Sequence, residues 1–444
     1  MRVTSDRPTV PSFTPSIEPR RVQLSDYELL TRVQRVSVPD TNLDLDHLSS
    51  SRGWKRVRGC THGTHVRIHS SNNPHECRIV VKSEISAPAS ELLSLLRSPT
   101  ESESNALLQA LYGSQFIYSS VIHAIPCVER RVLSSPRSHS TTQLLGTQQL
   151  TVRTITFAHK SRFGSFRQQS SRTRLKQHHK NEQGCFVDLV TPRPNGFQLA
   201  FCTLEAADIL AGKAPADRVV TLHPISGYLV AHPKPHKPET LEITFHAVFP
   251  GTVPGACDSQ VAHARLVCIG RGIGRLEKVL RRRRRFRRHQ RTVQGRVWQL
   301  LLHPFRGLGL VAFHEGIDQG THHNWHCIVC TRSFLPTLRK SWRRCDLCAY
   351  RICAEPPCCA DEHVTIYNRY VAPLLVCARC RECIGERERS SGQFRGGAEE
   401  DVCYTGVTLR FMSPPESELE PESERDPSGL SLDRYRQSSD GIEQ

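Results

Sequence analysis

The sequence predicts an α+β domain that is followed by a small metal-binding unit. Period-two strand patterns recur between residues 54 and 249, and one amphipathic helix is expected at 258–282. Ten of the 18 cysteines then lie between Cys327 and Cys383. Antiparallel strands before a long helix are typical of an α+β fold, and thiols this crowded are more typical of a metal site than of packing.

The expected α+β domain covers 54–285. Within it, Ala89–Leu96 and Glu103–Tyr112 read as helices, and Ser134–Thr142 and Ser161–Gln183 read as polar loops. In the strand Leu150–Phe157, alternation places Leu150, Val152, Thr154 and Thr156 on one face and Ile155 and Phe157 on the other. The other expected strands are Cys77–Glu84, Cys185–Val190, Phe197–Leu204, Arg218–Leu222, Gly227–Val230 and Glu242–Phe249.

The expected long helix has a conflict within its own sequence. Its apolar residues follow a spacing of three and four, but Gly270, Gly272 and Gly274 each cost about 1 kcal/mol relative to alanine in a helix. We therefore expect the helix to be held by packing against the sheet. The apolar positions are Leu266, Ile269, Ile273, Leu276 and Leu280.

Three further segments differ in composition from the α+β domain. Residues 1–50 are polar and rich in proline, so we expect them to be mostly disordered, with one helix near Tyr27–Val36. Residues 286–320 read as a basic linker or insertion, 321–388 as the cysteine-rich finger, and 389–444 as a disordered tail. We expect no signal peptide and no transmembrane helix, which places the cysteines in a reducing compartment.

The formal net charge of +17 favours an anionic partner, which is either nucleic acid or an acidic membrane surface. Residues 281–288 read RRRRRFRR. This run can bind nucleic acid, lie against an acidic membrane, or simply form the solvated end of the long helix. No catalytic motif was found: Gly272-x-Gly274 lies inside the helix pattern and lacks the strand that precedes a dinucleotide loop.

The cysteines of the finger fall in pairs. A CxxC turn places two thiolates on one side of a tight loop, at the distance that a tetrahedral zinc requires. Three CxxC pairs and a fourth pair of wider spacing make two zinc sites, and the metal would supply folding energy that the few apolar residues of this segment cannot. The pairs are Cys327 with Cys330, Cys345 with Cys348, Cys353 with Cys358 or Cys359, and Cys377 with Cys380.

The order of these residues resembles a FYVE-type zinc finger. Trp325 precedes the first CxxC, a basic run leads into Cys345, and Val376 precedes Cys377, as in that family. The resemblance implies a cross-brace of two zinc ions in a FYVE/PHD-type fold. Its ligands would be Cys327, Cys330, Cys353 and Cys358 (or Cys359) for the first ion, and Cys345, Cys348, Cys377 and Cys380 for the second.

The same resemblance implies a face that meets lipid. Arg343 and Arg344 stand where the family has a histidine pair, and with Lys340 they would attract an anionic headgroup such as a phosphoinositide. Phe334 and Leu335 would form a membrane-inserting tip. Asp346 replaces an arginine of the family motif and adds repulsion toward phosphate. The alternative is a structural zinc module that binds proteins.

Residues 54–285 resemble the START-like domains that often precede such fingers. The resemblance rests on these residues and segments: Trp54, Leu111–Phe116, Leu222–Tyr228 and Arg275–Glu277. The family has a helix-grip fold, in which a curved antiparallel sheet wraps a long C-terminal helix and leaves an apolar tunnel for a lipid. Residues that would line the tunnel, or else form ordinary core, are Phe157, Phe245, Phe249, Leu266 and Ile273.

Together these resemblances imply a non-enzymatic protein that accommodates a lipid and docks on acidic or phosphoinositide-containing membranes. We expect it to be cytoplasmic and peripheral on endosomal or other acidic membranes. Two alternatives belong to other classes. A RING-like ubiquitin ligase is also cross-braced, but no histidine lies between Cys345 and Cys353. A nucleic-acid binder would act through the arginine run.

Overall fold

The computed structural model describes residues 20–38, 53–61, 63–70, 76–98, 100–127, 148–159, 180–194, 196–251, 257–291, 324–334, 342–366, 370–383 and 410–411. The helices are α1 (Asp26–Gln34), α2 (Ala89–Arg97), α3 (Glu101–Tyr112), α4 (Ser259–Ile273) and α5 (Leu276–Arg291). The strands of the large sheet are β1 (Trp54–Arg56), β2 (Thr64–Ser70), β3 (Cys77–Ile85), β4 (Phe116–Cys127), β5 (Gln148–Phe157), β6 (Asn181–Arg193), β7 (Gly196–Leu204), β8 (Val219–Thr221), β9 (Ser226–Lys234) and β10 (Lys237–Phe249).

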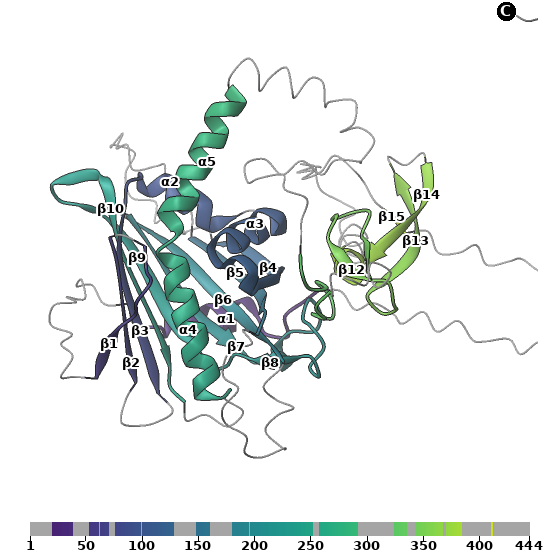
Figure 1. The fold of residues 1–444 in the computed structure, drawn as a ribbon, viewed down its shortest axis with the longest axis horizontal. Coiled ribbons are helices and arrows are strands. Elements are labelled where there is room, and N and C mark those ends of the chain that lie inside the picture. The colour runs from purple at the N-terminus through teal and green to yellow at the C-terminus, as the bar shows by residue number, and fades with distance from the viewer. Residues whose placement is uncertain are drawn as a thin grey trace, which may run out of the picture.

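The cysteine-rich segment adds short strands of its own. These are β11 (Trp342–Arg344), β12 (Arg351–Cys353), β13 (Cys359–Ile366), β14 (Tyr370–Cys377) and β15 (Arg410–Phe411). Strand β11 pairs with β12, and β13 lies between β14 and β15. Figure 1 shows this segment beside the β4 and β5 end of the large sheet.

The large sheet has the strand order β1-β2-β3-β10-β9-β7-β6-β5-β4, with β8 paired to β6. Every pairing along this path is antiparallel, and only β8 runs parallel to its neighbour. Helices α4 and α5 follow the last strand, and α4 lies along the sheet (Figure 1). The predicted α+β architecture is therefore present, as a large antiparallel sheet covered by helices.

The sheet buries both of its faces. The face toward α2, α3, α4 and α5, here called the helical face, carries the main apolar cluster, and the opposite face packs on α1. Strand β5 has the predicted alternation: Leu150 and Val152 face α1, whereas Ile155 and Phe157 belong to the helical face. Successive side chains of a strand point to opposite sides, and here each side meets a buried apolar layer.

The single helix predicted at 258–282 is two helices, and it extends further than expected. A turn at Gly274 and Arg275 separates α4 from α5, which runs on to Arg291. Residues 286–291 are thus helical rather than part of a linker; 292–320 lie outside the described residues. The glycines have a packing reason, because a Cβ on Gly270 would lie 2.6 Å from the Ile79 side chain, and one on Gly272 would lie 2.3 Å from the Tyr112 ring.

The N-terminal helix is confirmed as α1, but the prediction of disorder was wrong for residues 20–38. The Ser25 side chain caps α1 in a capping box with Glu28, and Leu29 and Val33 are buried against the sheet. The polar loop predicted at Ser161–Gln183 was wrong at its end, since β6 begins at Asn181. The remaining predicted disorder at both ends falls outside the described residues. None of the described helices is long and apolar enough to span a bilayer.

Candidate metal centres and the enclosed interior

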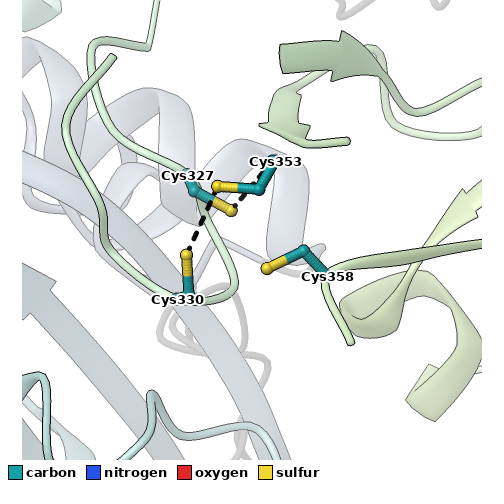
Figure 2. Close-up of side chains that lie close together, drawn as sticks. All are labelled: Cys327, Cys330, Cys353 and Cys358. Carbon is teal, nitrogen blue, oxygen red and sulfur yellow. Dashed lines mark hydrogen bonds between the residues drawn. The ribbon is translucent and has the colours of Figure 1, made fainter. Parts of the chain in front are cut away.

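The first metal centre is built by the turns after Cys327 and before Cys358. Thr331, with a positive φ of 60°, lets the chain turn back after Cys330, and its N–H donates to the Cys327 carbonyl oxygen. The Sγ atoms of Cys330 and Cys353 lie 3.5 Å apart, and the Cys353 N–H donates to the Cys327 Sγ (Figure 2). The fourth member is Cys358, and the Sγ atoms of all four cysteines lie within 4.8 Å of one another.

The second centre repeats the same construction. Ala349, with a φ of 59°, donates its N–H to the Cys345 carbonyl oxygen, as Thr331 does in the first centre. The Cys345 and Cys380 sulfurs are 3.8 Å apart, as are those of Cys348 and Cys377. Hydrogen bonds from the other three thiols lower the pKa of Cys345, and thiolate is the form that binds metal.

The two groups interleave along the chain. The first and third pairs form one group and the second and fourth pairs form the other, which is the cross-brace pairing that the sequence resemblance implied. A tetrahedral zinc with metal–sulfur bonds of about 2.3 Å separates its sulfurs by about 3.8 Å. The observed separations fit that geometry, so each group can hold one metal ion.

The alternative between Cys358 and Cys359 is decided by geometry. Cys358 joins the first group, and its N–H donates to the Glu355 carbonyl oxygen over 3.0 Å. The Cys359 thiol instead donates to the Cys353 carbonyl oxygen over 3.3 Å and begins strand β13. Adjacent residues in extended chain point in opposite directions, so only one of the two can reach the centre.

The structure differs from the lipid-binding face that was predicted for the finger. Phe334 is 7% exposed and packs against Trp342, so it belongs to the core of the finger and not to a membrane-inserting tip. Arg343 is exposed, whereas Arg344 donates to the Ala349 carbonyl oxygen. Leu335 and Lys340 lie outside the described residues.

Asp346 has a function in the fold that the sequence did not reveal. Its carboxylate accepts the N–H of Leu375 over 2.7 Å, and its own N–H donates to the Leu375 carbonyl oxygen. These bonds join the turn between Cys345 and Cys348 to strand β14. Asp346 therefore holds the second centre together.

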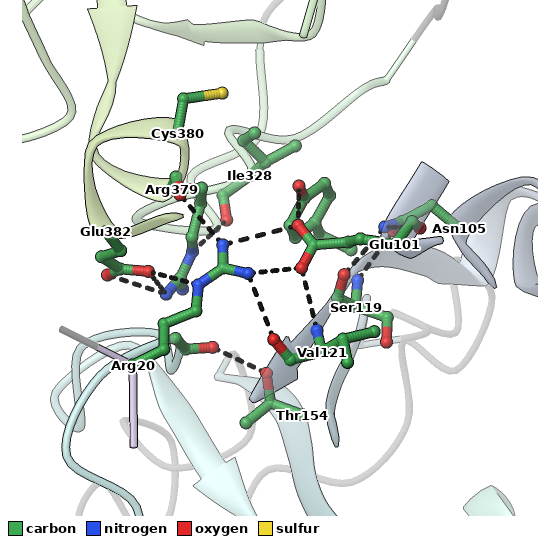
Figure 3. A network of polar contacts seen from close by, with 12 residues as sticks. Arg20, Glu101, Asn105, Ser119, Val121, Thr154, Ile328, Arg379, Cys380 and Glu382 are labelled. Atoms are coloured by element: carbon green, nitrogen blue, oxygen red, sulfur yellow. Dashed lines mark hydrogen bonds and ion pairs between the residues drawn. The ribbon is translucent and has the colours of Figure 1, made fainter. Parts of the chain in front are cut away.

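The finger and the sheet domain are joined by a buried ionic network. The Arg20 guanidinium pairs with Glu101 of α3 and with Glu382 of the finger, and it also donates to the carbonyl oxygens of Val121 and Arg379 (Figure 3). Desolvation opposes the charge of Arg20, but Glu101 and its other neighbours outweigh it and raise its pKa. No sequence pattern marked Arg20, which lies in a polar, proline-punctuated stretch.

Apolar contacts continue this junction. Ile117, Tyr118 and Ala158 of the sheet domain belong to one buried cluster with the finger cysteines. The Tyr118 ring meets that of Tyr350 edge to face, with centroids 5.3 Å apart, and its hydroxyl donates to Glu101. Asn181 donates to the Thr331 carbonyl oxygen, at the turn of the first metal centre. The finger therefore packs on the sheet domain as an integral part of the fold.

The five candidate tunnel residues come together where α4 packs on the sheet. Phe157, Phe245, Phe249, Leu266 and Ile273 are all buried in the cluster of the helical face. The Phe245 and Phe201 rings stack, with centroids 5.9 Å apart. The structure thus gathers the predicted residues in one enclosed apolar interior, and the tunnel itself stays a prediction.

Two ion pairs interrupt this apolar interior. Arg265 of α4 is 3% exposed; its Nε donates to Glu182 over 2.6 Å, and its guanidinium lies 4.2 Å from the Phe157 ring centroid. Nη2 donates to the Ala158 carbonyl oxygen, but Nη1 has no hydrogen-bond partner among the described residues. Arg153 differs, since it meets Asp188 through two nitrogens and Ser104 through the third.

Comparison with known proteins supports no family by sequence: no protein-family model and no curated protein matches the chain. Similar solved structures include a STAR-related lipid transfer protein from Xanthomonas axonopodis (12% identity, 52% of this chain and 99% of that chain, TM-score 0.33). Human StAR-related lipid transfer protein 5 is also similar (13% identity, 58% of this chain and 98% of that chain, TM-score 0.32). A Streptomyces aromatase/cyclase is similar as well (12% identity, 50% of this chain and 99% of that chain, TM-score 0.25). At these TM-scores the likeness assigns no function.

Proposed function

We propose that this chain is a non-enzymatic, START-like lipid-binding protein with a FYVE-type finger that holds two zinc ions. The observation that carries the lipid proposal is the Nη1 group of Arg265, which has no hydrogen-bond partner among the described residues and lies in a mainly apolar interior. An N–H group of a buried guanidinium that makes no hydrogen bond costs about 1–3 kcal/mol. The neighbouring Cys268 thiol is only a weak acceptor.

A lipid would complement both the apolar side chains of this interior and the Nη1 donor of Arg265. Its chain would pack among the phenylalanines of the helical face, at about 0.8 kcal/mol for each CH2 group buried. A headgroup or carbonyl oxygen would accept the hydrogen bond from Nη1. The pair with Glu182 holds the guanidinium in place, and the face of Phe157 supports it from one side.

Zinc is proposed for both metal centres because four thiolates in a tetrahedron are its common structural ligand set. Docking of the finger on acidic membranes stays a prediction. Of the residues expected for it, Arg343 is an exposed cation and Phe334 is buried. Zinc would thus act first by folding the finger against the sheet domain.

The test is to purify the full chain, extract it, and identify bound lipid by mass spectrometry. Arg265→Lys keeps the charge beside Glu182 but removes the Nη1 donor, so we expect at least a tenfold loss of bound lipid, which corresponds to about 1.4 kcal/mol. The matched control is Arg153→Lys, which changes a half-buried arginine whose nitrogens all have partners. A protein that carries no lipid, or equal loss in both variants, would reject the proposal.

A further inference from the structure

Strand β13 of the finger has one side that is only partly paired. Its whole length pairs with β14, but on the other side β15 meets only Val364 and Thr365. No strand of the described residues pairs with that side of Ala360–His363, which is here called the open edge. Figure 1 shows β13 and β14 on the side of the finger farther from the large sheet. The finger therefore presents a partly unpaired strand away from the domain junction.

The two candidate metal centres fix the backbone of the open edge. Strand β13 follows directly after Cys358 of the first centre, and β14 ends at Cys377 of the second. Within the open edge, the Glu362 carboxylate pairs with the Arg381 guanidinium over 2.6 Å. A strand points alternate N–H and C=O groups to each side, and here those groups are held in position before a partner arrives.

The C-terminal tail shows which kind of segment this strand accepts. Strand β15 adds antiparallel to β13, with Phe411 opposite Val364. In the sequence around β15, the apolar residues at 407, 409 and 411 alternate with Thr408 and Arg410. Alternation with a period of two is the pattern of an extended strand. Strand β13 therefore accepts an extended segment in which apolar and polar residues alternate.

The tail is not able to fill the open edge. In the register that sets Phe411 opposite Val364, each step toward the start of β13 is a step toward the C-terminus of the tail. Pro414 and Pro415 would then have to pair along the open edge, the first of them opposite Asp361. Proline has no N–H to donate and is excluded from the interior of a paired strand. A strand without these prolines would bond to more of β13 than the tail does.

We propose that the open edge is a docking site for an extended strand of a partner protein, which adds antiparallel to β13 and displaces β15. In this mode of binding, main-chain hydrogen bonds give affinity and the side chains give specificity. Asp361 is exposed and forms no ion pair within the described part of the chain, so a lysine or arginine opposite it would complete the match.

A second copy of this chain is a poorer occupant. Its tail carries the same two prolines, and its own open edge would set the carboxylates of Asp361 and Glu362 near those of the first copy. Like charges that face each other across paired strands are destabilising. The partner is therefore a different protein, with a proline-free strand that carries a basic residue.

The test measures the fluorescence anisotropy of two labelled peptides as the full chain is added. One peptide has the sequence of residues 406–416, and the other differs by Pro414→Lys and Pro415→Val. The second is expected to bind about tenfold more tightly, because it regains a backbone donor and meets Asp361 with a cation. The full-chain variant Arg410→Pro, Phe411→Pro lacks the competing strand and is expected to bind it at least about twofold more tightly than the wild type.

A charge reversal locates the site. Asp361→Lys is expected to weaken binding of the lysine peptide about fivefold, and a peptide with Pro414→Glu should restore it. The matched control is Glu239→Lys, the same reversal at an exposed residue of β10, which should bind as the wild type does. Melting curves and the zinc content check that the variants fold.

The proposal is overturned if neither protein binds the lysine peptide, if both peptides bind equally, or if the two charge reversals have equal effects. Sedimentation of the Arg410→Pro, Phe411→Pro variant without peptide tests the other occupant. A monomer is expected, and a dimer would assign the edge to a second copy and overturn the proposal of a separate partner.

Discussion

The guanidinium of Arg20 donates to the carbonyl oxygen of Arg379 over 3.0 Å, although 359 positions separate the two residues in the chain. The same side chain pairs with Glu101 of the sheet domain and Glu382 of the finger. One buried arginine from the N-terminal segment therefore links three parts of the molecule.

Replacement of Arg20 by methionine is expected to destabilise the fold by about 3–5 kcal/mol, because it leaves Glu101 without its buried ion-pair partner and Glu382 with Arg379 alone. Chemical denaturation of the full chain measures this. Arg332→Met is the control, since its pair with Glu355 is exposed and should be worth less than about 1 kcal/mol. Equal effects of the two variants would show that the junction does not stabilise the fold.

Substitution of single cysteines should separate ligands from bystanders. Cys358→Ser is expected to lower the zinc content from two ions to one per chain, whereas Cys359→Ser should retain both. Native mass spectrometry of the purified full chain counts the ions. Loss of an ion from the Cys359 variant alone would reverse the ligand assignment.

Chelation of the metal should loosen the sheet domain at the junction. Ile117 and Tyr118 of β4 pack on the finger, and the proposed zinc ions would supply the folding energy of the finger. Hydrogen exchange is therefore expected to accelerate in β4 after a chelator is added, while β10, between β3 and β9, serves as the internal reference. If the two strands respond alike, or if neither responds, the finger and the sheet are not coupled.

His246 predicts a loss of stability in mild acid. Burial, reinforced by Arg78, lowers its pKa to about 4 from an ordinary value of 6.5. Between these values the unfolded chain binds a proton that the folded chain does not, so stability falls as the pH drops from about 6.5 toward 4, by roughly 2–3 kcal/mol. Melting curves of the wild type and His246→Phe across this range are compared.

The variant should show the shallower dependence on pH, and an identical slope would remove His246 as the cause. Acid also protonates the cysteine thiolates, and this contribution is common to both proteins. Zinc release, followed with a chromogenic chelator in the same samples, shows where that second transition begins.

The local residue pattern was sufficient to predict those strands and helices in which buried positions recur at a regular spacing. In β5, the alternation of Leu150 and Val152 with Ile155 and Phe157 matches two different buried layers, so period two could be read directly. Helix α2 begins at Ala89, as predicted, and buries Leu92, Leu93 and Leu95.

Tertiary partners decided what the local pattern could not. The resemblance to a membrane-docking finger predicted that Phe334 forms an exposed tip, but Phe334 is buried against Trp342. Glu182 and Gln183 read as loop residues because they are polar, but buried partners at Arg265 and Thr156 keep them in β6. Cys358 and Cys359 are neighbours of the same type, and only the course of the chain distinguishes them.

The position of Arg20 has a consequence for the way the molecule is made. Its partner Glu382 lies 362 residues later, so the two cannot meet until the chain as far as Glu382 has left the ribosome. At about 5–20 residues per second, that interval is roughly 20–70 seconds. Once the strands of the large sheet have been made, the sheet domain exposes Ile117, Tyr118 and Ala158 until the finger follows and covers them.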